Sequence, residues 1–176
     1  QFDFEPKDHV DLAMSLDLAD FQRGAKVSGS RFYYLKGAGA LLQMALLRFA
    51  VDHLYHRGYS PMIVPELVRD MAMTGTGYFP LGREDAYALE KDELYLVGTS
   101  EVSLVSYHAD EMLALEELPR RYAGVSSCFR REAGSHGKDT KGIFRIHEFV
   151  KYEQVVLCEA SHEESVKIHE ELTANS

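Results

Sequence analysis

An α+β fold, with an antiparallel β-sheet flanked by helices, is predicted for this chain of 176 residues. One observation behind it is a long segment of helical apolar spacing at residues 37–56. Another is a pair of strand patterns, residues 122–132 and 143–157, which follow each other late in the chain without alternating strand–helix units. A third is size, because about 100–200 residues is usual for one domain and no repeat or linker divides the chain.

The N-terminal third predicts a short helix, a loop, a strand and a long helix. Asp8 can cap the first helix, which we expect to run to about Leu18 because its apolar side chains gather mostly on one side. Glycines mark the loop, aromatic density marks the strand, and a cationic turn followed by glycine ends the long helix. The expected loop, strand, helix and helix stop are residues 24–29, 31–35, 37–56 and 57–58.

The long helix carries two apolar stripes, although a helix at a monomer surface needs only one. Two interpretations stay open: the helix is buried within the domain, or it is shared between the core and a second subunit. In the second case we expect the first stripe to face the partner. The first stripe is Met44, Leu47, Val51 and Leu54, and the second is Leu42, Leu46 and Phe49.

The rest of the chain predicts strands separated by short helices and glycine-rich connectors. Strands are recognised by β-branched and aromatic residues, and connectors by glycine and proline. The expected elements are a strand at 60–64, a short helix from Glu66, a loop at 73–80, a strand at 93–97, a helix at 101–112, strands at 122–132 and 143–157 joined by a connector at 133–142, and a helix at about 161–173.

The composition excludes several classes of protein. Apolar residues make up 45%, and 10 Tyr and 9 Phe argue against a disordered chain. With 28 acidic and 19 basic residues the net charge is −9, which argues against nonspecific coating of nucleic acids. Polar residues such as Gln43, Arg48 and Asp52 interrupt the richest apolar run, so neither a transmembrane helix nor a membrane partner is expected.

Two features of the sequence indicate a cytoplasmic protein. Its two cysteines, Cys128 and Cys158, are too few for a disulfide scaffold or a four-thiolate zinc site, which fits a reducing compartment. The chain begins at Gln1 rather than Met and shows no charged-then-apolar signal segment. We therefore expect a piece of a longer cytoplasmic protein.

Common signatures of nucleotide and metal binding are missing from the sequence. Gly37 and Gly39 give two glycines of a dinucleotide fingerprint without the third, and no glycine-rich loop ends in Gly-Lys-Ser/Thr. The histidines form no HExxH motif, and His162 and His169 lie about 10.5 Å apart along a helix axis, too far to share one metal ion. We predict no metal site made by the protein, and we expect Cys128 to pack in a strand.

Charged residues cluster at the facing ends of the two long predicted strands. Because alternate residues of a strand share a face, Arg130 and Glu132 point together while Arg131 points away. In the return strand a guanidinium, an aromatic ring and a carboxylate, from Arg145, Phe149 and Glu153, share a face over about 27 Å.

This row of side chains has two interpretations. It suits a ligand with phosphates, a flat base and an ammonium or hydroxyl group, because a guanidinium fork matches phosphate oxygens and an aromatic face stacks on a base. The alternative is an exposed hairpin held by cross-strand salt bridges. Spacing alone leaves both open.

Three sequence motifs in this region resemble a known family. They are Phe-Arg-x-Glu at residues 129–132, Ala-Gly-Ser with Gly-Lys-Asp-Thr-Lys-Gly within 133–142, and Arg-x-His-x-Phe-x-Lys-x-Glu at 145–153. Together they resemble motif 2 of class II aminoacyl-tRNA synthetases, and in detail the bacterial type of seryl-tRNA synthetase. The long helix followed by a strand and Pro65 is similar to motif 1, which forms the dimer interface in this class. Further similar segments are residues 8–12, 24–37, 74–80 and 98–101.

The resemblance implies a class II synthetase catalytic core that acts as a serine–tRNA ligase. Its substrates would be L-serine, ATP with Mg²⁺, and tRNA(Ser), and it would be a homodimer. Attack of the serine carboxylate on the α-phosphorus builds charge on phosphoryl oxygens, which the guanidinium of Arg130 and Mg²⁺ stabilise. Arg130 is therefore the expected catalytic residue, and it would also hold the serine carboxylate.

The resemblance also assigns the other contacts. Glu132 would hold the adenine amino group, Phe149 would stack on adenine, and Glu153 would accept from the serine hydroxyl. Thr99 and Glu101 would hold serine near its amino group, although they also suit an N-cap and a first-turn acid of a helix. The expected ATP contacts are Arg130, Arg131, Glu132, Arg145, Ile146 and Phe149, and the expected serine contacts are Thr99, Ser100, Glu101 and Glu153.

One departure and two missing parts qualify the resemblance. The family usually has His-Gln-Phe where this chain has His147–Glu148–Phe149, and Glu148 faces away from Phe149. Motif 3 and the N-terminal coiled-coil arm that binds tRNA lie outside the chain, so residues 1–176 are expected to be part of a catalytic domain and not fully active alone. The alternatives are a synthetase-like paralogue that binds or regulates without aminoacylating, and a structural dimer module.

Overall fold

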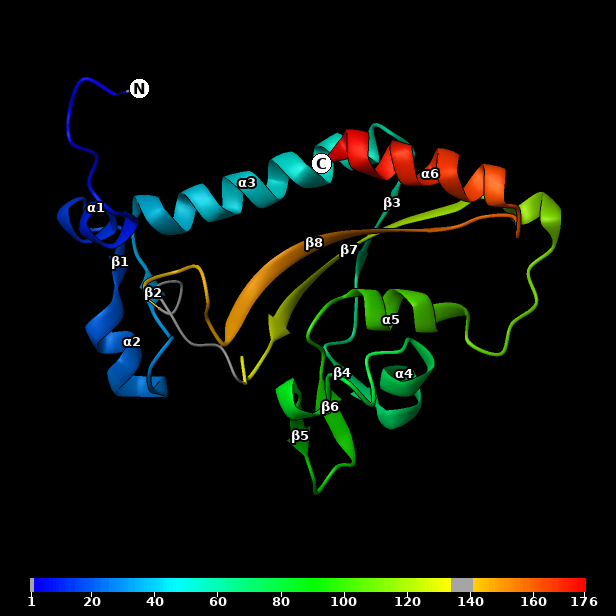
Figure 1. Cartoon of the computed structure of the whole chain (residues 1–176), viewed down its shortest axis with the longest axis horizontal. Coiled ribbons are helices and arrows are strands. Elements are labelled where there is room, and N and C mark those ends of the chain that lie inside the picture. The colour runs from blue at the N-terminus through cyan, green and yellow to red at the C-terminus, as the bar shows by residue number, and fades with distance from the viewer. Residues whose placement is uncertain (1, 134–140) are drawn as a thin grey trace.

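The computed structural model describes residues 2–133 and 141–176, arranged around a three-stranded sheet (Figure 1). Strand β7 (Arg120–Phe129) is central and pairs antiparallel with β8 (Glu148–Leu157). On its other side β7 pairs in parallel with β3 (Ser60–Ile63). The α+β prediction is confirmed. The parallel pair was not predicted, because it depends on the long crossover between β3 and β7 and not on any local pattern.

Helices cover both faces of this sheet (Figure 1). On one face lie α3 (Ala38–Tyr55) and α6 (His162–Asn175), which begins at the N-cap Ser161, and on the other lies α5 (Glu101–Val105). Each face is closed by its own small apolar cluster. These clusters are Leu54, Tyr59 and Ala123 on the α3 side, and Val64, Leu104 and Tyr122 on the α5 side.

A second, smaller antiparallel sheet follows β3 in the chain. Its strand order is β4 (Leu67–Arg69), β6 (Leu94–Leu96), β5 (Tyr87–Leu89), and it packs with α4 (Asp70–Gly75) around a buried cluster that includes Met73. The helix expected from Glu66 begins four residues later because β4 comes first. Strand β5 was missed, since three residues are too few to show a period.

The N-terminal segment departs from the prediction in several elements, and its first helix ends at Ser15 rather than near Leu18. Helix α1 (His9–Ser15) is capped by Asp8 as expected, but the loop expected at residues 24–29 is the second half of helix α2 (Phe21–Ser28). Gly24 is there for space rather than for a turn, since a Cβ at this position would overlap the Phe32 carbonyl oxygen. The expected strand at 31–35 is reduced to β2 (Tyr34–Leu35), which pairs with β1 (Ala19–Asp20).

Both long strands are shorter at the hairpin end than predicted. β7 ends at Phe129 and β8 begins at Glu148, so residues 130–132 and 143–147 lie beyond the paired region. Glu132 has a φ of +53°, which ends the extended conformation. The connector expected at 133–142 falls mostly on residues 134–140, outside the described residues. In place of the helix expected at 101–112, α5 is followed by a 3₁₀ turn at Ser106–His108. Two further 3₁₀ turns lie outside that range, at Leu115–Glu117 and, before β5, at Arg83–Asp85.

The two apolar stripes of α3 lie the other way round from the expectation. Leu54 is only 5% exposed and belongs to the core, and Leu47 and Val51 are half-buried. Leu46 and Phe49 are 61% and 69% exposed. The expectation that the stripe ending at Leu54 faces a partner is therefore wrong for Leu47, Val51 and Leu54, whereas Met44, its first member, is 65% exposed. The second stripe, with Leu42, is turned outward.

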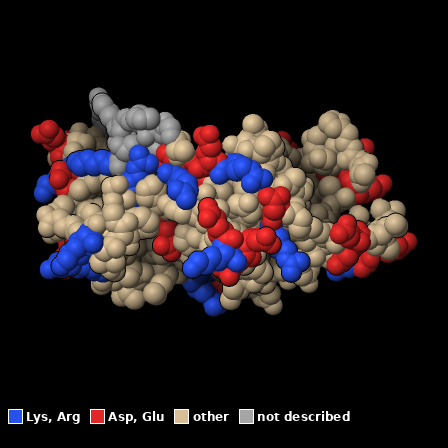
Figure 2. Space-filling model, turned by 90° about the horizontal axis from the view of Figure 1, so that it is seen from below, with Lys and Arg blue, Asp and Glu red and all other residues tan. Residues whose placement is uncertain are grey.

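Charges of both signs share the surface (Figure 2). In this view from below, basic side chains are more frequent at the left and acidic ones at the right, with both mixed in the middle. The sequence as a whole carries a net charge of −9. None of the helices in the described part of the chain has the length and hydropathy that crossing a membrane needs.

Candidate functional site

A cavity of about 670 Å³ lies where β7 has ended and β8 has not yet begun. Five of its seven lining residues were predicted from the sequence to contact ATP. The five are Arg130, Glu132, Arg145, Ile146 and Phe149, and the other two are Ile143 and Phe144. The structure thus brings together side chains from both arms of the hairpin, all beyond the region of regular pairing except Phe149, which lies within β8.

Backbone contacts between the two arms fix the position of Arg130. Its N–H donates to the carbonyl of His147 at 3.0 Å, and Nδ1 of His147 lies 3.0 Å from the Arg130 carbonyl. The Arg130 side chain is held as well, because Nε donates to the Gly98 carbonyl at 3.1 Å. The guanidinium is therefore oriented before any ligand arrives.

The other cavity groups combine charge with an aromatic face. The Arg145 guanidinium lies 2.8 Å from a carboxylate oxygen of Glu132, and the Arg130 guanidinium lies 5.4 Å from the centre of the Phe149 ring. Glu132 has a left-handed backbone conformation, with a φ of +53°, which is uncommon for a residue with a side chain. In this conformation its carboxylate forms the ion pair with Arg145. Two guanidinium groups, a carboxylate and a ring face are the chemistry that phosphates and a flat base require.

Arg131 lies outside this cavity, although it was among the expected ATP contacts. Its Nε donates to the Ala86 carbonyl at 3.0 Å, and its guanidinium lies 4.8 Å from the Tyr87 ring centre. Its N–H donates to the Asp85 carbonyl at 2.9 Å. Arg131 therefore connects the end of β7 to β5 and to the residues just before it.

A second polar cluster lies next to the cavity, where the chain enters α5. The Thr99 hydroxyl donates to Oε2 of Glu153, and the Ser100 hydroxyl lies 3.4 Å from the same oxygen. The N–H of Glu101 donates to Oγ1 of Thr99 at 3.3 Å, while the Glu101 side chain is exposed. Thr99 and Ser100 are buried. The structure thus brings together three of the four predicted serine contacts through their side chains and one through its backbone.

Lys151 completes this cluster and was not selected from the sequence. Its ammonium lies 2.7 Å from Oγ1 of Thr99 and 2.8 Å from Oε2 of Glu153. Burial by itself would raise the pKa of Glu153, but hydrogen bonds from Lys151 and Thr99 and the charge of Lys151 outweigh it and lower the pKa. The period of two in β8 could have found Lys151, since it shares a face with Glu153.

The two clusters are neighbours along one face of the hairpin. On β8 the residues Phe149, Lys151 and Glu153 alternate, and opposite them on β7 stand the small residues Cys128, Ser126 and Gly124. Cys128 is completely buried, in agreement with its expected packing role. Small partners leave room above the sheet for long polar side chains. The arrangement can therefore hold a molecule whose phosphates and base lie beside an ammonium or hydroxyl group.

Comparison with known proteins assigns this arrangement to a family. Residues 87–175 match the family described as the tRNA synthetase class II core domain (G, H, P, S and T). The chain belongs to this family. The matched segment of the class II core contains the hairpin and both polar clusters.

Relatives and solved structures resemble the chain over nearly its whole length. The serine–tRNA ligases of Corynebacterium glutamicum and Streptomyces coelicolor are 54% and 55% identical over 97% and 95% of this chain. The structure of seryl-tRNA synthetase from Pyrococcus horikoshii complexed with ATP superposes with a TM-score of 0.92 at 48% identity, covering 98% of this chain and 38% of that one. The Naegleria fowleri cytoplasmic serine–tRNA ligase in complex with AMP gives 0.93 at 33% identity, covering 98% and 40%.

The chain spans about 40% of the length of the curated relatives that it matches.

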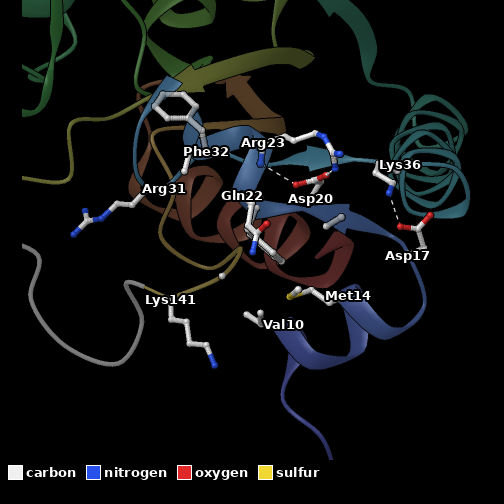
Figure 3. A pocket seen from close by; sticks show the side chains of 14 residues that line it. Val10, Met14, Asp17, Asp20, Gln22, Arg23, Arg31, Phe32, Lys36 and Lys141 are labelled. Atoms are coloured by element: carbon white, nitrogen blue, oxygen red, sulfur yellow. Dashed lines mark hydrogen bonds and ion pairs between the residues drawn. The ribbon is translucent and has the colours of Figure 1, made fainter. Parts of the chain in front are cut away.

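A separate cavity of about 510 Å³ lies at the N-terminal helices (Figure 3). It is lined by residues of α1, β1 and α2, by the segment that leads to α3, and by Lys141 and Gly142. Three cationic side chains at its wall are paired with carboxylates, so their charges are balanced locally. These pairs are Lys36 with Asp17, Arg23 with Asp20, and Lys141 with Asp8.

Within residues 2–133 and 141–176, the structure shows no group of three or more His, Cys, Asp or Glu side chains that could hold a metal ion.

Proposed function

We propose that this chain is part of the catalytic domain of a serine–tRNA ligase, which activates L-serine with ATP and transfers it to tRNA(Ser). The observation that carries the proposal is the adjacency of the Arg130 cavity and the Glu153 cluster along one hairpin. Support comes from the relatives at 54% and 55% identity, which are serine–tRNA ligases, and from the ATP in the Pyrococcus horikoshii structure.

The cavity residues suit the nucleotide. Arg130, held by Gly98, meets the α-phosphate, and the Phe149 ring offers a face for the adenine base. Glu132 accepts from the adenine amino group, and Arg145, its ion-pair partner, lies within reach of the phosphates. Ile146 is buried and lines the cavity, and its backbone would lie beside the base.

Adenylate formation needs no protein nucleophile. A carboxylate oxygen of serine attacks the α-phosphorus, the bond to the β-phosphate oxygen breaks, and pyrophosphate leaves with the electron pair. Negative charge grows on the α-phosphoryl oxygens, where a fixed guanidinium stabilises the transition state more than the ground state. We also propose that ATP is used as its Mg²⁺ complex, whose charge neutralises the phosphates.

The Glu153 cluster suits the amino acid. Oε2 of Glu153 already receives donors from Thr99 and Lys151, and none of those bonds uses Oε1. A serine hydroxyl can donate to Oε1, whereas alanine in the same place supplies no donor to Oε1 of this partly buried carboxylate. The cluster therefore supplies a reason for preferring serine.

The assembly and the location are also part of the proposal. The exposed Leu46 and Phe49 on α3 suit an interface with a second copy, so we propose a homodimer. The chain spans about 40% of the length of its relatives, so we propose that it belongs to a longer protein that also contains the coiled-coil arm and motif 3. We also propose that this protein is cytoplasmic.

Amino-acid-dependent exchange of pyrophosphate into ATP by the longer protein tests the function. We expect exchange with L-serine and little with L-alanine. Glu153→Ala should reduce serine activation far more than it weakens ATP binding. A longer protein that binds ATP without any exchange would indicate a binding or regulatory paralogue and contradict the proposal.

A further inference from the structure

Lys151 is the cation at the centre of the amino-acid cluster. It stands two residues before Glu153 on β8, so both side chains project from the same face of the sheet. The Lys151 side chain is 30% exposed and that of Glu153 is 20% exposed, so their ion pair is more shielded than the pairs at the surface. The exposed pair of Lys167 with Glu164 on α6, where the lysine is 70% exposed, is a useful contrast.

The hydrogen bonds around Thr99 show what Lys151 does. A threonine hydroxyl has one hydrogen and two lone pairs. Thr99 donates that hydrogen to Oε2 of Glu153, and it accepts from Lys151 at 2.7 Å and from the N–H of Glu101 at 3.3 Å. Its capacity is fully used. Oε2 of Glu153 is similarly occupied by Thr99, Lys151 and the more distant Ser100 hydroxyl.

We infer that Lys151 is a positioning residue for serine recognition: its ammonium locks Thr99 and Oε2 of Glu153 together and leaves Oε1 for the amino-acid hydroxyl. This inference rests on the proposed function. Without Lys151, Thr99 loses one donor and the Glu153 carboxylate is free to rotate, so no single oxygen is presented to the substrate. A purely structural salt bridge on β8 would not be specific for serine.

Burial is the largest single effect on the pKa of Glu153 and raises it, and the hydrogen bond from Lys151 is the largest of the effects that lower it. Lys151 is the cation that lowers the Glu153 pKa, against a burial effect that raises it. The groups that face Glu153 are Lys151 on β8, Thr99, Ser100 and the Glu101 backbone at the start of α5, and Cys128 on β7. Cys128 is buried, and burial raises the pKa of its thiol, so it stays neutral.

The test compares Lys151→Met and Lys151→Arg with the control Lys167→Met in the longer protein. We expect Lys151→Met to raise the KM for serine about 10-fold to 100-fold, the usual range for losing a hydrogen bond to a charged group, with the KM for ATP changed less than about twofold. Lys151→Arg should recover part of the loss. Lys167→Met should match wild type, since it removes the same charge from an exposed pair.

A second readout separates positioning from stability. In Lys151→Met the acid limb of the serine-dependent rate should move to higher pH, because Glu153 then protonates more easily. A ¹³C NMR titration of the Glu153 carboxyl, assigned with Glu153→Gln, should show the same displacement in the absence of substrates. Unchanged serine KM and unchanged Glu153 titration would overturn the inference, as would equal losses for serine and ATP.

The same measurements keep this inference apart from the proposed function. If the wild type shows no serine-dependent exchange, the function is wrong. The NMR titration then still decides whether Lys151 controls Glu153, and an unchanged titration overturns the inference in that case too.

Discussion

Arg130 and His147 hold each other across the point where the two strands have already ended. The Arg130 N–H donates to the His147 carbonyl at 3.0 Å, and the His147 ring returns a contact of 3.0 Å to the Arg130 carbonyl. The ring also lies 5.4 Å from the ring of Phe32, which packs it from the N-terminal segment. The contacts between His147 and Arg130 therefore align the two arms of the cavity where strand pairing has ended.

Replacing His147 should disturb Arg130 without emptying the cavity. His147→Ala removes the ring contact, so we expect adenylate formation to slow by about 10-fold to 100-fold, the range expected for a small misplacement of a catalytic group. His147→Asn retains an N–H donor close to the position of Nδ1 and should preserve most of the rate. Single-turnover adenylation measures both, and equal rates for the two variants would contradict this role.

Part of the site could be predicted from the sequence because a period of two survives in β8. Phe149 and Glu153 lie within the strand, where alternation places them on one face. Arg145 lies before β8 begins, and so the argument from alternation does not apply to it. Arg145 is held at the cavity by its ion pair with Glu132. Glu132 has a left-handed backbone conformation, which no sequence pattern predicted.

The fold could be predicted where local rules and tertiary packing agree. The cap at Asp8 and the C-terminal end of α3 followed from capping chemistry. Helix α2 was missed because Gly24 was interpreted as a turn residue, whereas its small size serves the close approach of Phe32. The outward stripe of α3 could not be chosen, because both stripes are apolar and only packing against the sheet distinguishes them.

Arg130 and Arg131 offer a direct comparison between two neighbouring guanidinium groups. Arg130→Ala should slow adenylate formation by about 10²–10³, the cost of removing one electrostatic stabiliser of a developing oxyanion. Arg131→Ala should leave the single-turnover rate within about twofold, since its guanidinium lies on Ala86 and Tyr87, although stability can fall. Similar rates for both variants would show that Arg130 is only a hairpin contact.

Tyr59 should make stability depend on alkaline pH. It is 1% exposed and donates to Glu171 at 2.9 Å, a carboxylate that also binds Arg121. Burial, and then the Glu171 hydrogen bond, raise its pKa to about 12. Because ionisation is easier in the unfolded chain, this stabilisation is complete below about pH 10 and is lost as the pH rises through 12.

Urea unfolding of wild type and Tyr59→Phe checks this dependence. At neutral pH the variant should be less stable by about 1 kcal/mol, the usual net value of a hydrogen bond. The difference should shrink between pH 10 and 12. The other tyrosines are common to both proteins, so their titration cancels. Two stability curves that stay parallel over this range would contradict the Tyr59 assignment.

The outward stripe of α3 should control dimerisation. Leu46 and Phe49 are 61% and 69% exposed, and together they form an apolar surface that a second copy can cover. Leu46→Asp with Phe49→Asp should give a folded monomer in sedimentation experiments on the longer protein. Leu54→Asp should instead unfold it, because Leu54 is 5% exposed and packs in the core.

Val27→Asp is the matched control for this experiment, since Val27 is an equally exposed apolar residue, at 67%, on a different helix. It should leave the dimer intact. A double Leu46 and Phe49 variant that remains dimeric would place the interface elsewhere. Loss of the dimer in Val27→Asp as well would show that any added charge disrupts assembly, and that the α3 surface has no special part in it.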